Sequence, residues 1–135
     1  MAADGSVSAA KVLPARTELA SAYRRLMATF ITIGYGDPAS YDRTDPVVRD
    51  AAHAHDAQLV ATGVLMGIAG APVQVRNHGN AGVETIQRRY LQSDMPLAGF
   101  AVIEAADMDE AIRLVASTPC AVAGGVVEVW PLATP

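Results

Sequence analysis

The chain has 135 residues, of which 51% are hydrophobic and 5% aromatic, and it carries a formal net charge of −4. This length fits one domain that forms its core without metal or disulfides. The acidic balance argues against a nucleic-acid partner, and no apolar run reaches the roughly 18 to 20 residues that span a bilayer. The N-terminus lacks the regions of a secretory signal, and the lone Cys120 suits a reducing compartment. We therefore expect a cytoplasmic protein that binds neither nucleic acid nor a membrane.

The N-terminal segment differs in composition from the rest of the chain. Residues 1–15 are small and polar without periodicity, which predicts a disordered lead, and Thr17 is an N-cap candidate for a short helix after it. Because Met27 directly precedes the first strand, we also expect it to be the biological start. Residues 1–26 are then an extension and 27–135 the domain. The intact mass of the protein from its native source tests this start.

The first half of the domain predicts a strand and a long helix. Alternating β-formers cover 28–35, and Gly36-Asp37-Pro38 predicts a turn after them. Asp45 is an N-cap candidate and Pro46 suits the first helical position, so we predict a helix over 46–61. The small residues of its inward face let it pack closely on a sheet. This face comprises Val48, Ala51, Ala52, His55, Leu59 and Thr62.

A hairpin is predicted in the middle of the chain. Residues 64–68 have the composition of a second strand. Residues 73–76 and 83–86 can pair as two further strands around the polar loop 77–82. Residues 87–96 then form an irregular connection to the next part of the chain.

The C-terminal part predicts a strand, a helix and a last strand. A β-rich run covers 99–104, and Asp107 followed by Glu110 has the spacing of a capping box, so a helix begins directly after Asp107. Pro119 ends this helix. β-Branched residues then predict a strand over 126–130.

These elements predict an α+β fold. The order is β-α-β, a hairpin insertion and a second β-α-β, which is the ferredoxin-like split βαβ arrangement. With both helices on one face of the sheet, the other face is too apolar for water. Two such sheets can cover each other, so we expect a homodimeric α+β barrel.

His55 and Asp37 are the candidate catalytic residues. His55 lies on the predicted inward face, and Asp37 at the end of the first strand can hold the imidazole tautomer while His55 acts as a base. The alternative is a partly buried His55 bonded to a backbone carbonyl. His53 lies on the opposite face together with Arg49 and Asp56, and we interpret these three as a solvated surface patch.

The sequence offers one anion site and disfavours a metal site. Arg88 and Arg89 present guanidinium groups that can bind a small anion, and we include Tyr35 as a third candidate ligand-binding residue. The alternative for the arginines is a solvated basic turn. His53 and His55 point roughly 200° apart on a helix and cannot share a zinc ion. We therefore expect neither a metal nor a cofactor.

Several segments resemble the YCII-related proteins, and more closely the branch named for an Asp-Gly-Pro-Phe motif. They are Tyr35-Gly36-Asp37, ATGVLM at 61–66, LAGFAVIEAADMDEAIRLVA at 97–116 and Val-Glu-Val at 127–129. The resemblance implies a dimeric α+β barrel of ferredoxin-like subunits. It implies little about activity, because the relatives are only suspected to be small enzymes that use a His and an Asp in a cleft.

The chain departs from this family at the positions where chemistry is expected. The segment VETIQRRYLQSDMP at 83–96 stands where the branch carries Asp-Gly-Pro-Phe. Ala123 stands where relatives often place a His before the last strand. Ala52 takes the position of the helix His, with His55 one turn later. We therefore expect an altered active site.

Two functions of different classes follow. The first is a dimeric module with a degenerate site that binds a small organic ligand or contacts a partner. The second is a small enzyme in which His55 and Asp37 move a proton during isomerisation, elimination or hydrolysis. Haem or flavin handling, by analogy with other dimeric α+β barrels, rests on the fold alone.

Overall fold

The structure is a computed structural model that describes residues 16, 18–19 and 26–133. The predicted lead at 1–15 and most of the predicted helix that follows Thr17 lie outside these described residues. The described chain contains both helices and strands, so the predicted α+β class is confirmed. None of its helices is both long enough and apolar enough to cross a membrane.

A four-stranded antiparallel sheet forms the centre of the domain. Its strands lie in the order β2-β5-β1-β6, so that β5 separates β1 from β2. β3 and β4 pair with each other as a separate hairpin. The strands are β1 (Ala28–Tyr35), β2 (Leu65–Ile68), β3 (Gln74–Arg76), β4 (Glu84–Ile86), β5 (Leu97–Ala105) and β6 (Val126–Pro131).

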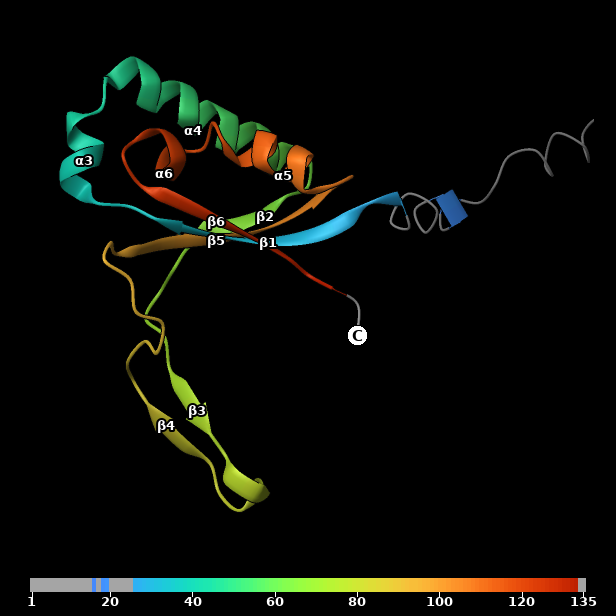
Figure 1. Cartoon of the computed structure of the whole chain (residues 1–135), viewed down its shortest axis with the longest axis vertical. Coiled ribbons are helices and arrows are strands. Elements are labelled where there is room, and N and C mark those ends of the chain that lie inside the picture. Colours follow the sequence, from blue (N-terminus) through green and yellow to red (C-terminus); the bar gives the residue numbers. More distant parts are fainter. Residues whose placement is uncertain (1–15, 17, 20–25, 134–135) are drawn as a thin grey trace, which may run out of the picture.

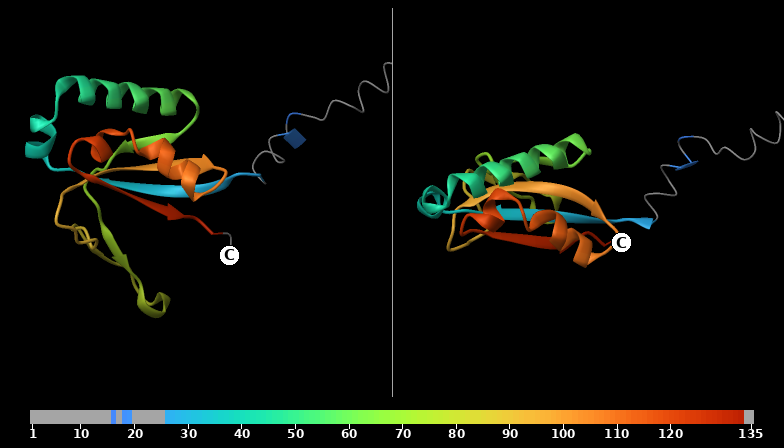
Figure 2. Two further views of the ribbon diagram at one scale, coloured as in Figure 1. Left: turned by 45° about the horizontal axis from the view of Figure 1, so that its top comes forward. Right: turned by 90° about the horizontal axis from the view of Figure 1, so that it is seen from above.

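The helices all cover one face of this sheet, and the hairpin extends to the other side (Figure 1). In the left view of Figure 2 the hairpin also stands clear of the sheet. The helices are α3 (Pro38–Arg43), α4 (Pro46–Ala61), α5 (Met108–Val115) and α6 (Pro119–Val122), with a 3-10 turn over His78–Asn80 at the hairpin tip.

Local capping explains where the two longer helices begin. The Asp45 carboxylate accepts a hydrogen bond from the Val47 backbone N–H at 2.9 Å, and Pro46 needs no partner at the first helical position. At α5 the Asp107 carboxylate accepts from the Glu110 N–H at 2.9 Å, and Glu110 accepts in return from the Ala106 N–H. Both helix starts agree with the sequence prediction.

Two short helices were not predicted. Asp37 caps α3 by accepting from the Ala39 N–H, with Pro38 at the first helical position, where the sequence analysis expected only a turn. Pro119 begins α6 instead of ending α5, which already ends at Val115. Proline is compatible with either position because its fixed φ suits a helix start and its missing N–H prevents a helix interior.

The core lies between the sheet and the helices. Its buried members are small or β-branched apart from one aromatic ring, and they alternate along β1 and β5 as a half-covered sheet requires. They are Phe30, Ile103, Ala105, Ala111 and Val115. On α4 only Ala52 and Leu59 are buried. Val48 and Ala51 are exposed, so the predicted inward face of this helix was too broad.

The opposite face of the sheet is apolar and open within the described chain. Phe100 and Trp130 alternate with the core residues of their strands and remain 46% and 55% exposed, and Leu65 on β2 is 73% exposed. Polar side chains interrupt this apolar face, among them Tyr35 and Glu128, where the Tyr35 hydroxyl donates to the Glu128 carboxylate at 2.7 Å. This bond, together with burial of the ring, raises the pKa of Tyr35.

Candidate functional site

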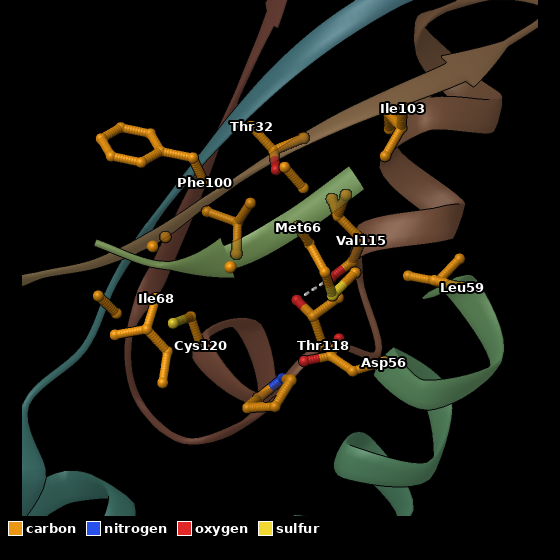
Figure 3. Close-up of a pocket in the computed structure, with 17 residues that line it drawn as sticks. Thr32, Asp56, Leu59, Met66, Ile68, Phe100, Ile103, Val115, Thr118 and Cys120 are labelled. Atoms are coloured by element: carbon orange, nitrogen blue, oxygen red, sulfur yellow. Dashed lines mark hydrogen bonds between the residues drawn. The ribbon is translucent and has the colours of Figure 1, made fainter. Parts of the chain in front are cut away.

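A cavity of about 300 Å³ lies between α4, α6 and the helix-covered face of the sheet. We call it the helix-side cavity. Most of its lining is apolar, and the side chains used in the argument below come from β1, β2, α4 and the start of α6 (Figure 3). They are Thr32, Asp56, Leu59, Met66, Thr118 and Cys120. The Phe100 side chain points away from this group toward the open face of the sheet (Figure 3).

Asp56 carries the only carboxylate that lines the cavity within the described chain. The side chain points from α4 into the hollow (Figure 3). Its Oδ1 atom is buried and has no hydrogen-bond partner among the described residues. Burial raises the pKa of Asp56, while His55 and His53 nearby act in the opposite direction. A buried oxygen without a partner costs free energy, so a turn of the side chain that brings this atom to the cavity and gives it a ligand partner would be favoured.

Thr118 and Cys120 supply further polar groups of the cavity lining. The Thr118 hydroxyl donates to the Val115 carbonyl at 2.7 Å, so its proton is already used and its oxygen remains free to accept. Burial raises the pKa of the Cys120 thiol, and the charge of Asp56 raises it further. The thiol is therefore kept protonated, which makes it a poor nucleophile.

His55 and Asp37, the predicted catalytic pair, bond to different partners. The His55 Nε2 atom forms a 2.7 Å hydrogen bond with the Leu114 carbonyl oxygen on α5. Asp37 accepts from the Ser40 hydroxyl at 3.0 Å and from the Ala39 N–H at 3.3 Å, and these bonds lower its pKa. Hence His55 links α4 to α5 through this hydrogen bond, and Asp37 caps the start of α3. Catalysis by the pair stays a prediction.

Asp37 also lines a second hollow of about 240 Å³. Tyr41 lines it as well, and Pro119 and Cys120 line both this hollow and the helix-side cavity. The second hollow is therefore a neighbour of the cavity, separated from it by the first turn of α6.

The predicted surface patch of His53, Arg49 and Asp56 is divided in the structure. The His53 Nε2 atom and the Tyr41 hydroxyl are hydrogen-bonded at 2.7 Å, and the Arg49 guanidinium lies 5.0 Å from the centre of the Tyr41 ring. These two residues thus fasten α4 to α3. Asp56, in contrast, lines the helix-side cavity, so its assignment to a solvated patch was wrong.

Arg88 and Arg89 line different hollows of the extended connection between β4 and β5. Arg88 lies beside the hairpin with Arg76, whereas Arg89 approaches Ser93 and influences Tyr35 through its charge. Anion binding by Arg88, Arg89 and Tyr35 stays a prediction.

Asp56 is a candidate site residue that was not singled out from the sequence. It lies four residues after Ala52 and three before Leu59, the two buried positions of α4, and these spacings share one helix face. The signal was therefore present. It was overlooked because a carboxylate was assumed to face water. The described residues contain no group of three or more His, Cys, Asp or Glu side chains that could hold a metal ion.

Comparison with known protein families gives a match. A family model described as the YCII-related domain matches residues 28–133 of the chain, which include all the strands and helices named above. A search of curated proteins finds no significant match.

Proposed function

Since the chain belongs to the family of YCII-related domains, we propose that it is a binding protein whose small organic ligand occupies the helix-side cavity. The observation that carries this proposal is the cavity itself. Its volume of about 300 Å³ lies within the size range of ligand pockets, and it combines an apolar lining with a few convergent polar groups.

The chemistry of the lining supports binding over catalysis. The Cys120 thiol is kept protonated by its surroundings, and His55 is engaged with a backbone carbonyl. Ala52, one helix turn before Asp56, is buried. It stands where relatives tend to place a histidine, and its methyl side chain cannot accept or donate a proton. A cavity that lacks a catalytic base is what we expect of a degenerate active site.

A thermal-shift screen of small organic compounds tests the proposal, because a ligand that binds only the folded state raises the melting temperature. Met66→Trp fills the cavity from β2 and should abolish the shift produced by any hit. Val60→Trp adds the same bulk at an exposed position of α4 and should retain the shift. The proposal fails if no compound stabilises the protein, or if Met66→Trp leaves every shift unchanged.

We further infer that two copies form a homodimeric α+β barrel through their open sheet faces. The interleaved strand order β2-β5-β1-β6 supports a ferredoxin-like subunit, and the exposed rings of Phe100 and Trp130 supply the apolar surface. A second copy of the same face is self-complementary under twofold symmetry. The helix-side cavity lies on the other side of the sheet and so remains accessible in such a dimer.

One observation favours a small enzyme as a second function. Asp37 is held as a carboxylate by its hydrogen bonds and lines the hollow next to the cavity, where it could orient a base. In this case His55→Gln and Asp37→Asn should each abolish a turnover that the wild type shows with a cavity ligand. Unchanged turnover in both variants would exclude the pair.

A further inference from the structure

The polar groups of the helix-side cavity are mainly hydrogen-bond acceptors. The Asp56 carboxylate accepts only, and the Thr118 hydroxyl has already given its proton to the Val115 carbonyl. Of the remaining polar side chains, Thr32 has a hydroxyl that can turn either way, and the Cys120 thiol is a weak donor. A ligand that satisfies this cavity must therefore bring donors of its own.

The charge of the cavity also favours a ligand that brings hydrogen-bond donors. Asp56 is an acidic group, and no Lys, Arg or His is among the described residues that line the cavity. An anionic ligand would meet Asp56 without a compensating cation. A cationic ligand would pair with it in an apolar setting, where charge-assisted hydrogen bonds are strong.

The number of ligating groups argues for an organic cation over a metal ion. Asp56 supplies one carboxylate, whereas calcium takes six to eight oxygen ligands and structural zinc takes four ligands of nitrogen or sulfur. An alkylammonium group needs only a few acceptors, because each of its N–H bonds makes one hydrogen bond. Its apolar remainder would contact Leu59, Met66 and the other apolar lining.

On this basis, and resting on the proposed function of the cavity, we propose that its ligand is a small apolar amine whose ammonium group pairs with Asp56. The Asp56 carboxylate receives one N–H, and the Thr118 oxygen, which belongs to the lining of the same cavity, receives another. A turn of the Asp56 side chain toward the amine would also give its buried Oδ1 atom, which lacks a partner among the described residues, a hydrogen-bond donor.

Isothermal titration with matched probes tests this ligand class. Phenethylamine and hexylamine represent apolar amines, 2-phenylethanol is a neutral analogue, and 3-phenylpropanoate is an anionic one. We expect both amines to bind the wild type about tenfold or more tightly than the alcohol, because a charge-assisted bond to a buried carboxylate exceeds a neutral one. The carboxylate should bind most weakly.

Two variants locate the interaction. Asp56→Asn keeps the shape of the side chain and should remove the preference for amines, while Asp50→Asn removes the same charge at an exposed position of α4 and should preserve it. Thr118→Val should weaken amine binding by a smaller factor. It provides a second test of the same contact if Asp56→Asn does not fold.

The outcomes separate this inference from the proposed function. If the alcohol binds as tightly as the amines, or if Asp56→Asn retains the preference, the ammonium inference is overturned while the cavity remains a binding site. If none of the four probes binds, the ammonium inference is overturned, and the compound screen with Met66→Trp then decides the proposed function separately.

Discussion

At the scale of single residues, Asp56 is an acidic residue that lines a cavity instead of facing water. The side chain occupies the inward face of α4 between Ala52 and Leu59, and one of its oxygens has no partner within the described chain. The neighbouring Cys120 is influenced by the same carboxylate. The protonation states of these two groups are therefore linked, and each can be measured.

The stability of the protein should depend on pH through Asp56. Burial raises its pKa in the folded state, so ionisation costs more in the folded chain than in the unfolded chain. Below the unfolded value of about 4 both states hold the proton and no penalty exists. As the pH rises from there through the folded pKa, the wild type should lose stability relative to Asp56→Asn, and the difference should then level off.

Urea unfolding of both proteins across this pH range measures the effect. Asp50→Asn on the exposed side of α4 is the matched control, and its difference from the wild type should not grow in the same way. A constant gap between wild type and Asp56→Asn at all pH values would contradict the prediction.

Cys120 should react slowly with iodoacetamide in the folded protein. Burial and the charge of Asp56 both raise the pKa of the thiol and reduce the thiolate fraction. Asp56→Asn removes one of these causes, so it should accelerate alkylation, whereas Asp50→Asn should not. Mass spectrometry after timed quenching gives the rates, and equal rates in the wild type and Asp56→Asn would refute the electrostatic link.

At the scale of elements, the same pair of residues starts two helices of different length. Asp-Pro precedes both α3 and α4, and in each case the aspartate caps and the proline occupies the first turn. The sequence analysis recognised the second pair because an apolar period followed it. The helix that begins at the first pair, Pro38–Arg43, has only six residues, which is too short to show an apolar period.

The cap of α5 provides a quantitative test at this scale. Asp107→Ala removes the bond to the Glu110 N–H and should cost about 1 kcal/mol of unfolding free energy. Asp109→Ala changes an exposed acidic residue of the same turn that does not cap the helix, and should cost less. Chemical denaturation compares the two variants, and a larger loss for Asp109→Ala would contradict the assignment of the cap.

At the scale of the whole molecule, the two faces of the sheet have different roles. The face covered by helices holds the core and the helix-side cavity, and the open face presents large apolar side chains without a cover in the described chain. The hairpin β3–β4 stands clear of the sheet on that open side (Figures 1 and 2). A single copy therefore leaves an unusually large apolar surface in water.

Phe100→Glu should convert the proposed dimer to a monomer. The ring lies on the open face. Burying a side chain of this size at an interface contributes about 1.5–3 kcal/mol. A glutamate at the same position would lose this contribution and add the cost of burying a charge. Ile112→Glu makes a similar change on α5, on the side of the helices, where the residue is 49% exposed. That variant should remain dimeric.

Light scattering coupled to size exclusion distinguishes the two states. A wild type that is monomeric at micromolar concentration would refute the dimer, and so would a Phe100→Glu variant that keeps the mass of the wild type. The mass of Ile112→Glu controls for a general effect of a new surface charge.

The sequence by itself determined most of the elements, because their signals are local. The capping residues Asp45 and Asp107 and the alternation along 28–35 lie within a few positions of the structure they specify, and the α+β class followed from their order. The packing face of α4 was predicted only in part. Its period was clear, but Val48 and Ala51 are exposed in the structure.

Only the tertiary structure decided which side chains meet. The bond between His55 and Leu114 joins positions 59 residues apart, and the cavity brings Asp56 beside Thr118 and Cys120 from a different β-α-β unit. These contacts depend on how α4 and α6 pack over the sheet. The spacing of residues along the sequence does not determine that packing. The physical reason is that periodicity fixes the direction of a side chain from its own element, whereas burial and partners are set by the element packed against it.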